Sequence, residues 1–410
     1  MKKNNNTFYS PRVNLTLYTL LLIATPFLIV RNYLQQVIGM TSQLSLSFLG
    51  INIPYILAFV FIVLVSLILV FRPKITKLNL IGSAAVVLMM VIGQNSTDYY
   101  FNHKFFELQH NWHYIAYAIF SYIFYRYLKE KAYSSERIVL ITFISAICIS
   151  TFDEAAQILI SNRIFDICDI SKDIWGSIIG MVVVFIIIEK GKIFKSDWKL
   201  RQKKLSSYLQ YPASLLFLEM FFAYFILLIS SILSENKYIW IALLFSILAF
   251  LIFFFIFHYS QKRGFRRVFI SLGVLILLIQ GGFFLKYRNS NIVYNKPGIV
   301  VYKGIPIPYF DIMIFPNGTF RLVDKKIYFN QKDKVNRIYK HVNHILLLGS
   351  GADGEGGMGF IDEKMETQFL FNPIQKTALQ VIVLKTAEAC EEFNILKSKG
   401  YDAMFIIHNN

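Results

Sequence analysis

The sequence is poor in charged residues, and this shortage excludes an ordinary water-soluble protein. Asp, Glu, Lys and Arg together make up 16% of the chain, whereas about 25% is usual in soluble domains. Hydrophobic residues make up 55%, and the mean hydropathy is +0.50. The apolar excess extends over most of the chain and predicts an integral membrane protein built from long apolar helices.

Cysteine is also scarce, and acidic residues are fewer than basic ones. The three cysteines, Cys148, Cys168 and Cys390, have no metal-binding or redox spacing, which argues against a disulfide framework. The net charge of +17 raises the question of nucleic-acid binding. The Lys and Arg residues form short clusters between apolar runs, as in cytoplasmic loops of membrane proteins, so we expect no nucleic-acid partner.

The apolar runs predict about nine transmembrane helices, each of roughly 20 residues. The first run, Val13–Val30, lacks a small-residue cleavage site at its end and predicts a retained anchor. The expected spans begin near Val13, Ile53, Leu78, His113, Ile138, Ile174, Pro212, Tyr238 and Val268.

The distribution of cations predicts how the chain crosses the membrane. Clusters such as Arg72–Lys77, Arg126–Arg137, Lys190–Lys204 and Lys262–Arg267 alternate with loops that hold far fewer Lys and Arg residues. Cytoplasmic loops carry the excess of positive charge. We therefore expect a cytoplasmic N-terminus, and an odd number of spans then puts the C-terminal part outside.

After Leu285 the pattern changes to short alternating runs and turn signals, which predict a small α+β domain of about 120 residues. Pro316-Asn317-Gly318 predicts a turn between two of its strands. The expected strands are Ile299–Tyr302, Phe310–Phe315, Thr319–Val323, Lys326–Phe329, His344–Leu348, Gln380–Leu384 and Ala403–Ile407. The expected helices are Val335–His341 and Ala387–Lys399.

Polar residues gather between the third and sixth spans, where ionisable groups near a membrane point to function. By the expected topology they meet at the outer side of the membrane. The binding candidates are His113, Tyr117, Glu154, Gln157, Arg163, Asp169 and Asp173. Such a cluster is suited to binding a lipid head group or to acid–base chemistry, with Glu154 and Asp173 as catalytic candidates. Structural packing is the alternative interpretation. No metal-ligand spacing is present, so we expect neither a metal nor a cofactor.

These residues resemble the motifs of the VanZ-like membrane protein family over about residues 78–190. His113 and Tyr117 match its His-x-x-x-Tyr, and Glu154 and Gln157 match an acidic residue followed three positions later by Gln. The remaining motif is an Arg followed, after a spacer, by Asp-x-x-x-Asn/Asp-x-x-Gly-x-x-x-Gly. It is matched by Arg163, Asp169, Asp173, Gly176 and Gly180. The two glycines are candidates for close helix packing. The resemblance implies a cell-envelope setting like that of glycopeptide-resistance proteins, and the composition suits a Gram-positive bacterium.

The last part of the chain, residues 292–410, resembles the Mth938-like domain. Its most specific pattern is Thr-x-x-Ala-Cys-x-x-x-Asn-x-Leu, matched by Thr386, Ala389, Cys390, Asn394 and Leu396. The resemblance implies a β/β/α sandwich without an established enzymatic activity, acting as a module that binds a protein partner. A nucleophilic role for Cys390 is the alternative to a buried thiol.

Together these observations predict an all-α polytopic membrane domain followed by a small α+β domain. The expected parts are two N-terminal helices (1–77), a VanZ-like four-helix core (78–190), three further helices (191–287) and the Mth938-like domain (292–410). The first functional hypothesis is recognition of a lipid-linked or cell-wall-related molecule, with membrane lipids as further partners. A membrane enzyme acting on a lipid head group is the alternative, and a transporter is the second alternative.

Overall fold

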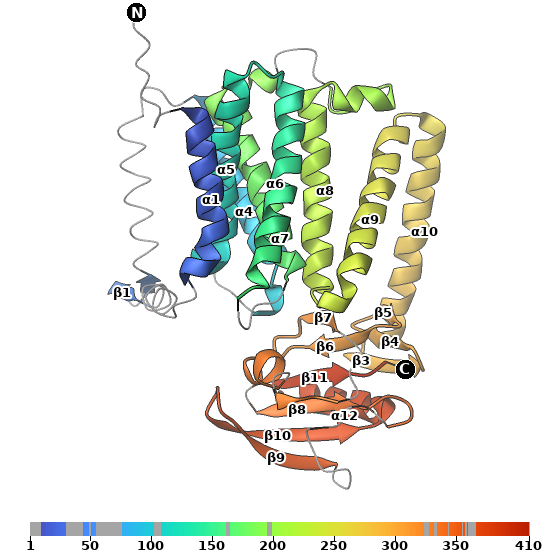
Figure 1. Ribbon diagram of the computed structural model, residues 1–410. Coiled ribbons are helices and arrows are strands. Elements are labelled where there is room, and N and C mark those ends of the chain that lie inside the picture. Colours follow the sequence, from blue (N-terminus) through green and yellow to red (C-terminus); the bar gives the residue numbers. More distant parts are fainter. Residues whose placement is uncertain are drawn as a thin grey trace, which may run out of the picture. The chain divides into compact units, whose positions relative to one another are not determined.

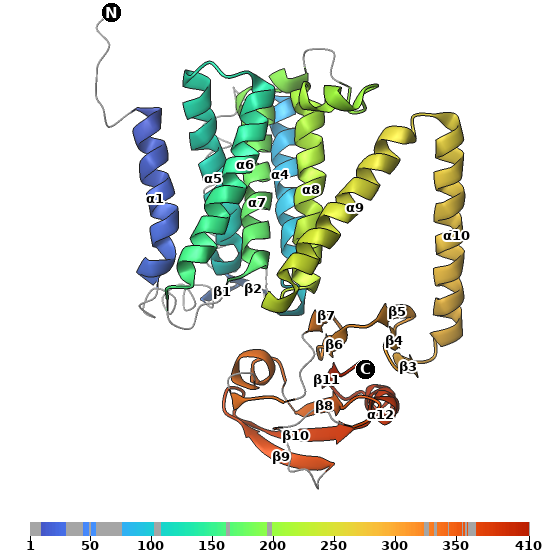
Figure 2. The ribbon, with the colours of Figure 1, turned by 45° about the vertical axis from the view of Figure 1, so that its right-hand side comes forward.

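The computed structural model describes residues 10–29, 44–48, 51–54, 76–101, 108–160, 165–194, 199–323, 328–331, 334–342, 344–354, 356, 359 and 366–409. The chain divides into two compact units (Figures 1 and 2). The first comprises residues up to Ser231 together with Leu243–His258, and the second comprises Ile232–Ala242 and Tyr259–Asn410.

Long helices make up most of the chain before residue 288. They are α1 (Pro11–Ile29), α4 (Lys77–Ser96), α5 (Leu108–Glu130), α6 (Ser135–Gln157), α7 (Ile167–Val182), α8 (Pro212–Ile232), α9 (Ile239–Tyr259) and α10 (Arg263–Tyr287). A hairpin of β1 (Ser45–Phe48) and β2 (Ile51–Pro54) follows α1. Short 3-10 helices cover Tyr99–Phe101, Lys192–Phe194, Leu205–Leu209 and Asn236–Tyr238, and a π-helix, Val183–Ile188, continues α7.

Six helices among the described residues are long and apolar enough to cross a membrane, which indicates a multi-pass membrane protein. They are α4, α6, α7 with its π-helical extension, α8, α9 with the short helix before it, and α10. This number is lower than the nine expected spans. The first and fourth expected spans form α1 and α5, which are not among the six. The start of the second expected span belongs to β2, and the rest of that span lies outside the described residues.

The helix α7 lies at the centre of the first unit, between its neighbours (Figure 2). Every residue from Ile170 to Val182 is buried. The core around it consists of apolar side chains of α6, α7 and α8, including Val139, Ile178 and Leu227, which are all fully buried. The charged residues near the start of α7 therefore face protein rather than lipid.

The second unit carries two β-sheets. A three-stranded antiparallel sheet has the order β3-β4-β5, and a six-stranded mixed sheet has the order β7-β6-β11-β8-β10-β9, in which β8 is parallel to both β10 and β11. The strands are β3 (Ile292–Lys296), β4 (Ile299–Tyr302), β5 (Ile305–Pro308), β6 (Asp311–Ile314), β7 (Phe320–Val323), β8 (Ile345–Gly349), β9 (Thr367–Asn372), β10 (Thr377–Leu384) and β11 (Ala403–Ile407).

One helix, α12 (Thr386–Ser398), packs on these strands and closes their core. Its Phe393 stacks on Phe405 of β11 with ring centroids 5.0 Å apart. Cys390 is buried beside Phe393, and burial raises the pKa of its thiol to about 12. That environment favours the buried, unreactive thiol over a nucleophile. The second unit also includes the turn before α9, where the Tyr238 hydroxyl donates to the Val323 carbonyl at 3.0 Å.

Most expected strands of this unit are present, with differences that have physical reasons. The expected strands Ile299–Tyr302 and Ala403–Ile407 coincide with β4 and β11. The expected helix Val335–His341 is a π-helix at Lys334–Tyr339, and most of the expected strand Lys326–Phe329 lies outside the described residues. Strands β3, β5 and β9 were not expected. Strand β5 has the sequence Ile-Pro-Ile-Pro, and its prolines are tolerated because β5 lies at the edge of its sheet.

Candidate functional site

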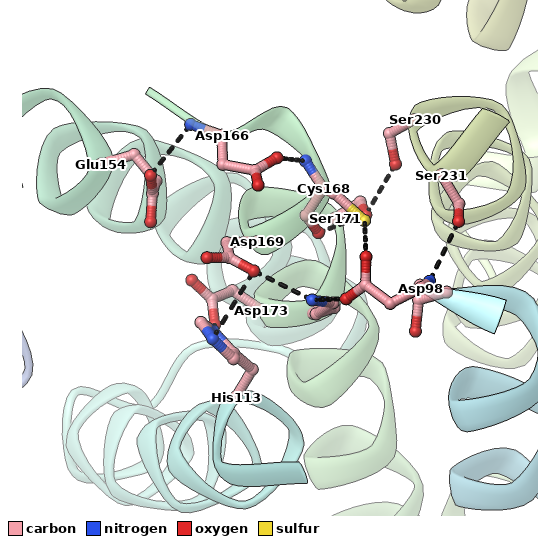
Figure 3. Close-up of polar contacts among 12 residues, drawn as sticks. Asp98, His113, Glu154, Asp166, Cys168, Asp169, Ser171, Asp173, Ser230 and Ser231 are labelled. Atoms are coloured by element: carbon pink, nitrogen blue, oxygen red, sulfur yellow. Dashed lines mark hydrogen bonds and ion pairs between the residues drawn. The ribbon is translucent and has the colours of Figure 1, made fainter. Parts of the chain in front are cut away.

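The candidate site is a network of charged side chains on α5, α6, α7 and the segment after α4 (Figure 3). The helices bring the residues together because their polar positions fall at the ends of apolar segments. The start of α7 is capped by Asp166, whose carboxylate accepts from the Cys168 backbone N–H at 2.8 Å. This cap begins the helix just before Asp169, Lys172 and Asp173.

His113 and Asp173 form the core of the network. The Nδ1 atom of His113 lies 2.8 Å from Oδ1 of Asp173, and the Ser150 hydroxyl donates to the other oxygen, Oδ2, at 2.7 Å. Because a carboxylate only accepts, this contact places a hydrogen on Nδ1. The opposite ring nitrogen, Nε2, lies 3.7 Å from Asp169. Asp173 therefore orients the His113 ring.

Lys172 is the buried cation of the network. Its ammonium group pairs with Asp98 and, at 3.0 Å, with Asp169. The backbone N–H of Asp98 in turn donates to the Ser231 hydroxyl at 3.1 Å, and the Ser230 hydroxyl donates to Ser171 at 2.9 Å. The end of α8 thus anchors both the Asp98 segment and α7.

A second group of acidic and amide side chains lies at the end of α6. Glu154 accepts from the Gln157 side chain at 2.9 Å and from the Asp166 backbone N–H at 3.1 Å. The Gln157 side chain also donates to Asp153 at 3.4 Å. Glu154 is only 1% exposed, so it connects the end of α6 to the start of α7 and presents no open carboxylate.

Exposure separates the network into a buried support and an open edge. The side chains of His113 and Asp169 are 25% and 22% exposed, whereas those of Asp173 and Lys172 are 2% and 6% exposed. His113 and Asp169 are therefore the members through which a molecule from outside can make contact.

The structure brings together six of the predicted site residues. His113, Glu154, Gln157, Asp169 and Asp173 belong to the two connected groups described above. Tyr117 packs its ring against Phe120, with ring centroids 5.9 Å apart, and its hydroxyl lies close enough to Asp173, Asp153 and Ser150 to interact with them electrostatically. Arg163 lies outside the described residues.

Gly176 and Gly180 lie where α7 approaches α5. A Cβ atom on Gly176 would come within 2.8 Å of the Tyr114 Cα atom, and one on Gly180 within 2.5 Å of the Ala118 carbonyl oxygen. Only a hydrogen fits at these positions because the obstacle is backbone. The close approach holds His113 against the charged face of α7.

Several members of the network were not among the predicted site residues. Asp98 follows an apolar run, just as Asp153 and Glu154 follow another, so the same signal could have found it. Ser150, Ser230 and Ser231 carry no comparable signal, since serines are common in membrane helices. Lys172 was visible in the sequence but became significant only through its two carboxylate partners.

The described residues contain no group of three or more His, Cys, Asp or Glu side chains arranged to hold a metal ion. Comparisons with protein-family models, with curated proteins and with solved structures find no match for this chain.

Proposed function

We propose that this chain is a VanZ-like protein of the cell envelope whose charged network recognises a lipid-linked or cell-wall-related molecule at the outer face of the cell membrane. The observation that carries the proposal is the open edge formed by His113 and Asp169 on a buried, interlocked support. Charged groups within a membrane domain are costly and are generally functional. A support held from four segments keeps the edge in one geometry, as recognition requires.

The charge balance indicates the chemistry of the recognised group. Among the described residues, Lys172 and His113 face the carboxylates of Asp98, Asp169 and Asp173, with Glu154 nearby. An acidic edge attracts ligand groups that donate hydrogen bonds or carry positive charge. We therefore expect an amine- or hydroxyl-bearing part of the envelope molecule to contact Asp169 and His113.

The enzyme alternative rests on the Asp173–His113 pair. A histidine whose ring is oriented by a carboxylate can accept and return a proton at its other nitrogen. In this arrangement His113 would be the acid–base group and Asp173 its positioning residue. Glu154 would have a structural role, since both of its oxygens accept hydrogen bonds from neighbouring groups.

The C-terminal part is proposed to be an Mth938-like interaction module for a protein partner. The proposal rests on the sequence pattern around Thr386–Leu396 and on a helix packed against mixed β-structure. Both α9 and α10 are long and apolar enough to cross a membrane, and the topology that we propose puts the C-terminal part outside the cell, facing the cell wall.

Expression in a teicoplanin-susceptible Gram-positive host tests the recognition proposal. The wild-type chain is expected to raise the inhibitory concentration of teicoplanin, whereas His113→Gln and Asp169→Asn abolish the rise at equal protein level. Glu130→Gln, at an exposed position on the same helix as His113, is the matched control and keeps it. An unchanged inhibitory concentration with the wild-type chain, or full protection by both variants, contradicts the proposal.

The variants His113→Gln, Asp169→Asn and, in addition, Asp173→Asn separate recognition from catalysis. Purified protein is incubated with envelope lipids extracted from the host, and new products are sought by mass spectrometry. An enzyme converts lipid and loses turnover in both His113→Gln and Asp173→Asn. A recognition protein leaves the lipids unchanged and retains them on purification, with retention lowered by Asp169→Asn.

A further inference from the structure

A second ionisable group lies inside the membrane domain, away from the charged network. Glu219 is in the first half of α8 and is 5% exposed. Within the described residues, neither of its carboxylate oxygens has a hydrogen-bond partner. The hydroxyl of Thr142 on α6 is likewise buried and without such a partner in that part of the chain.

Both side chains reach the same level of the bundle, next to α7. The contacts Glu154–Asp166 and Ser150–Asp173 show that α6 and α7 run antiparallel. Thr142 is roughly two turns before Ser150 on α6, so it lies at the level of Met181 on α7.

The contacts between α8 and α7 give the level of Glu219 along α7 in the same way. The contacts Ser230–Ser171 and Tyr224–Trp175 show that α8 also runs antiparallel to α7. Glu219 is roughly one and a half turns before Tyr224, which corresponds to Gly180 on α7. The ring contact between Phe143 and Phe222, with centroids 6.1 Å apart, shows that α6 and α8 meet at this level.

The backbone of α7 changes its geometry just beyond this point. The helix continues from Val183 to Ile188 with π-helical hydrogen bonds. Single π-helical turns within α-helices are rare and are frequently found at functional sites. Two buried polar side chains, which have no hydrogen-bond partner among the described residues, therefore lie just before the level at which the backbone of α7 changes.

The surroundings decide the charge state of Glu219. On the same face of α8, one turn before and after it, stand the apolar residues Leu216 and Ala223, which belong to the apolar core of the first unit. An isolated carboxylate in such surroundings is so costly that the group takes up a proton instead. Among the described residues, none forms a hydrogen bond to Glu219 and no Lys, Arg or His pairs with it.

From this geometry we infer that Glu219 is an intramembrane proton-binding site, at the level of the buried Thr142 hydroxyl and close to the level where α7 becomes π-helical. The site goes beyond the proposed recognition function, because it lies about 16 Å along α8 from Ser230 and the charged network. It also supplies an ionisable group in the membrane core, which a coupled transporter requires and which the outer network does not provide.

Infrared spectroscopy of the full chain in lipid vesicles tests the assignment. At neutral pH the wild-type spectrum is expected to contain the C=O stretch of a protonated carboxylic acid, shifted in deuterated water and missing in Glu219→Gln. A Glu219→Gln spectrum that instead loses an ionised carboxylate band, or keeps the acid band, overturns the assignment.

A second measurement does not depend on the variant folding. Dicyclohexylcarbodiimide, an apolar reagent for protonated carboxyl groups, is added to wild-type vesicles, and labelled peptides are identified by mass spectrometry. We expect labelling at Glu219 and none at Glu130, an exposed position at the end of α5. Absence of the label at Glu219 overturns the assignment. Protection of Glu219 by sodium or potassium ions also overturns it, because a metal cation would then occupy the carboxylate.

Discussion

At the scale of single residues, the carboxylates of the membrane domain have three kinds of surroundings. Asp98 is buried and paired with the Lys172 cation, and Asp173 is buried and hydrogen-bonded to His113. Glu219 is buried and has no hydrogen-bond partner among the described residues, and Glu189 lies just beyond the π-helix in an ion pair. Breaking a buried pair by removing one partner typically costs about 3–5 kcal/mol, because the other charge stays buried. The paired carboxylates therefore hold the network together, and among its described carboxylates Asp169 combines an ion pair with the most exposed side chain.

Glu189 gives a prediction about pH. It accepts from Lys129 and Tyr125, and Lys192 lies 3.3 Å away; the Lys129 contact, the largest cause, lowers the pKa of Glu189 to about 2. Because this pKa is lower in the folded than in the unfolded chain, the pair stabilises the fold above about pH 5 and its contribution disappears as the pH falls towards 2. The loss is below about 1 kcal/mol, since Lys129 is half exposed.

Thermal unfolding of wild type and Glu189→Gln in detergent between pH 7 and pH 2 measures this effect. The variant is expected to melt lower at pH 7, and the difference should vanish at the acidic end. Lys190→Gln, next to Glu189 but outside the ion pair, is the control. A difference in melting temperature that stays constant over the whole range would falsify the assignment.

At this scale the sequence predicted the location of the charged network better than its contacts. Residues three or four positions apart share a helix face, so the sequence predicted that Asp169 lies beside Asp173 and that Glu154 lies beside Gln157. It could not show that Ser150 completes the hydrogen bonding of Asp173 or that Asp98 neutralises Lys172, because those partners come from other segments. Tyr117 shares a helix face with His113, and its ring packs against apolar residues near α1 while its hydroxyl lies near Asp173 and Ser150.

At the scale of elements, the contact between α5 and α7 depends on glycine. Replacing Gly180 by Ala is expected to destabilise the domain by about 1–3 kcal/mol, because the added methyl group would meet the backbone at Ala118. The measurement is the melting temperature of the purified protein in detergent.

A matched control lies on α10. No atom comes within 4 Å of a Cβ built on Gly273, so Gly273→Ala should leave the melting temperature unchanged or slightly higher. Equal behaviour of the two variants would show that the α5–α7 contact does not need glycine.

Helix and strand positions were largely predictable because apolar periodicity determines them. Helices α1, α4, α6, α8 and α9 begin close to the expected starts, whereas α5, α7 and α10 begin earlier, at Leu108, Ile167 and Arg263. The π-helix of α7 was not predictable, since its sequence Val-Val-Phe-Ile-Ile-Ile is as compatible with an α-helix. Strand β5 was missed because its prolines argue against strand formation.

At the scale of the whole molecule, the remaining question is which side of the membrane each part faces. A reporter that combines alkaline phosphatase and β-galactosidase, attached after Asn410, is expected to give phosphatase activity and thus an extracytoplasmic position. The same reporter inserted after Gln202, between α7 and α8, should give galactosidase activity, because that loop is rich in Lys and Arg. Galactosidase activity at both positions would mean that one expected span does not cross and that the C-terminal part faces cytoplasmic partners.

The burial of α7 has a consequence for how the protein is made. A helix that carries Asp169, Lys172 and Asp173 near one end gains little from entering lipid alone. Its stable environment exists only once α5 and α6, which precede it, and α8, which follows it, are in the membrane. During synthesis we therefore expect α7 to stay beside the insertion machinery or its earlier neighbours. Its stabilising contacts are complete only after Ser230 and Ser231 have been made. A nascent chain cut short before α8 would hold its charged network only half assembled, and we expect cellular quality control to remove it.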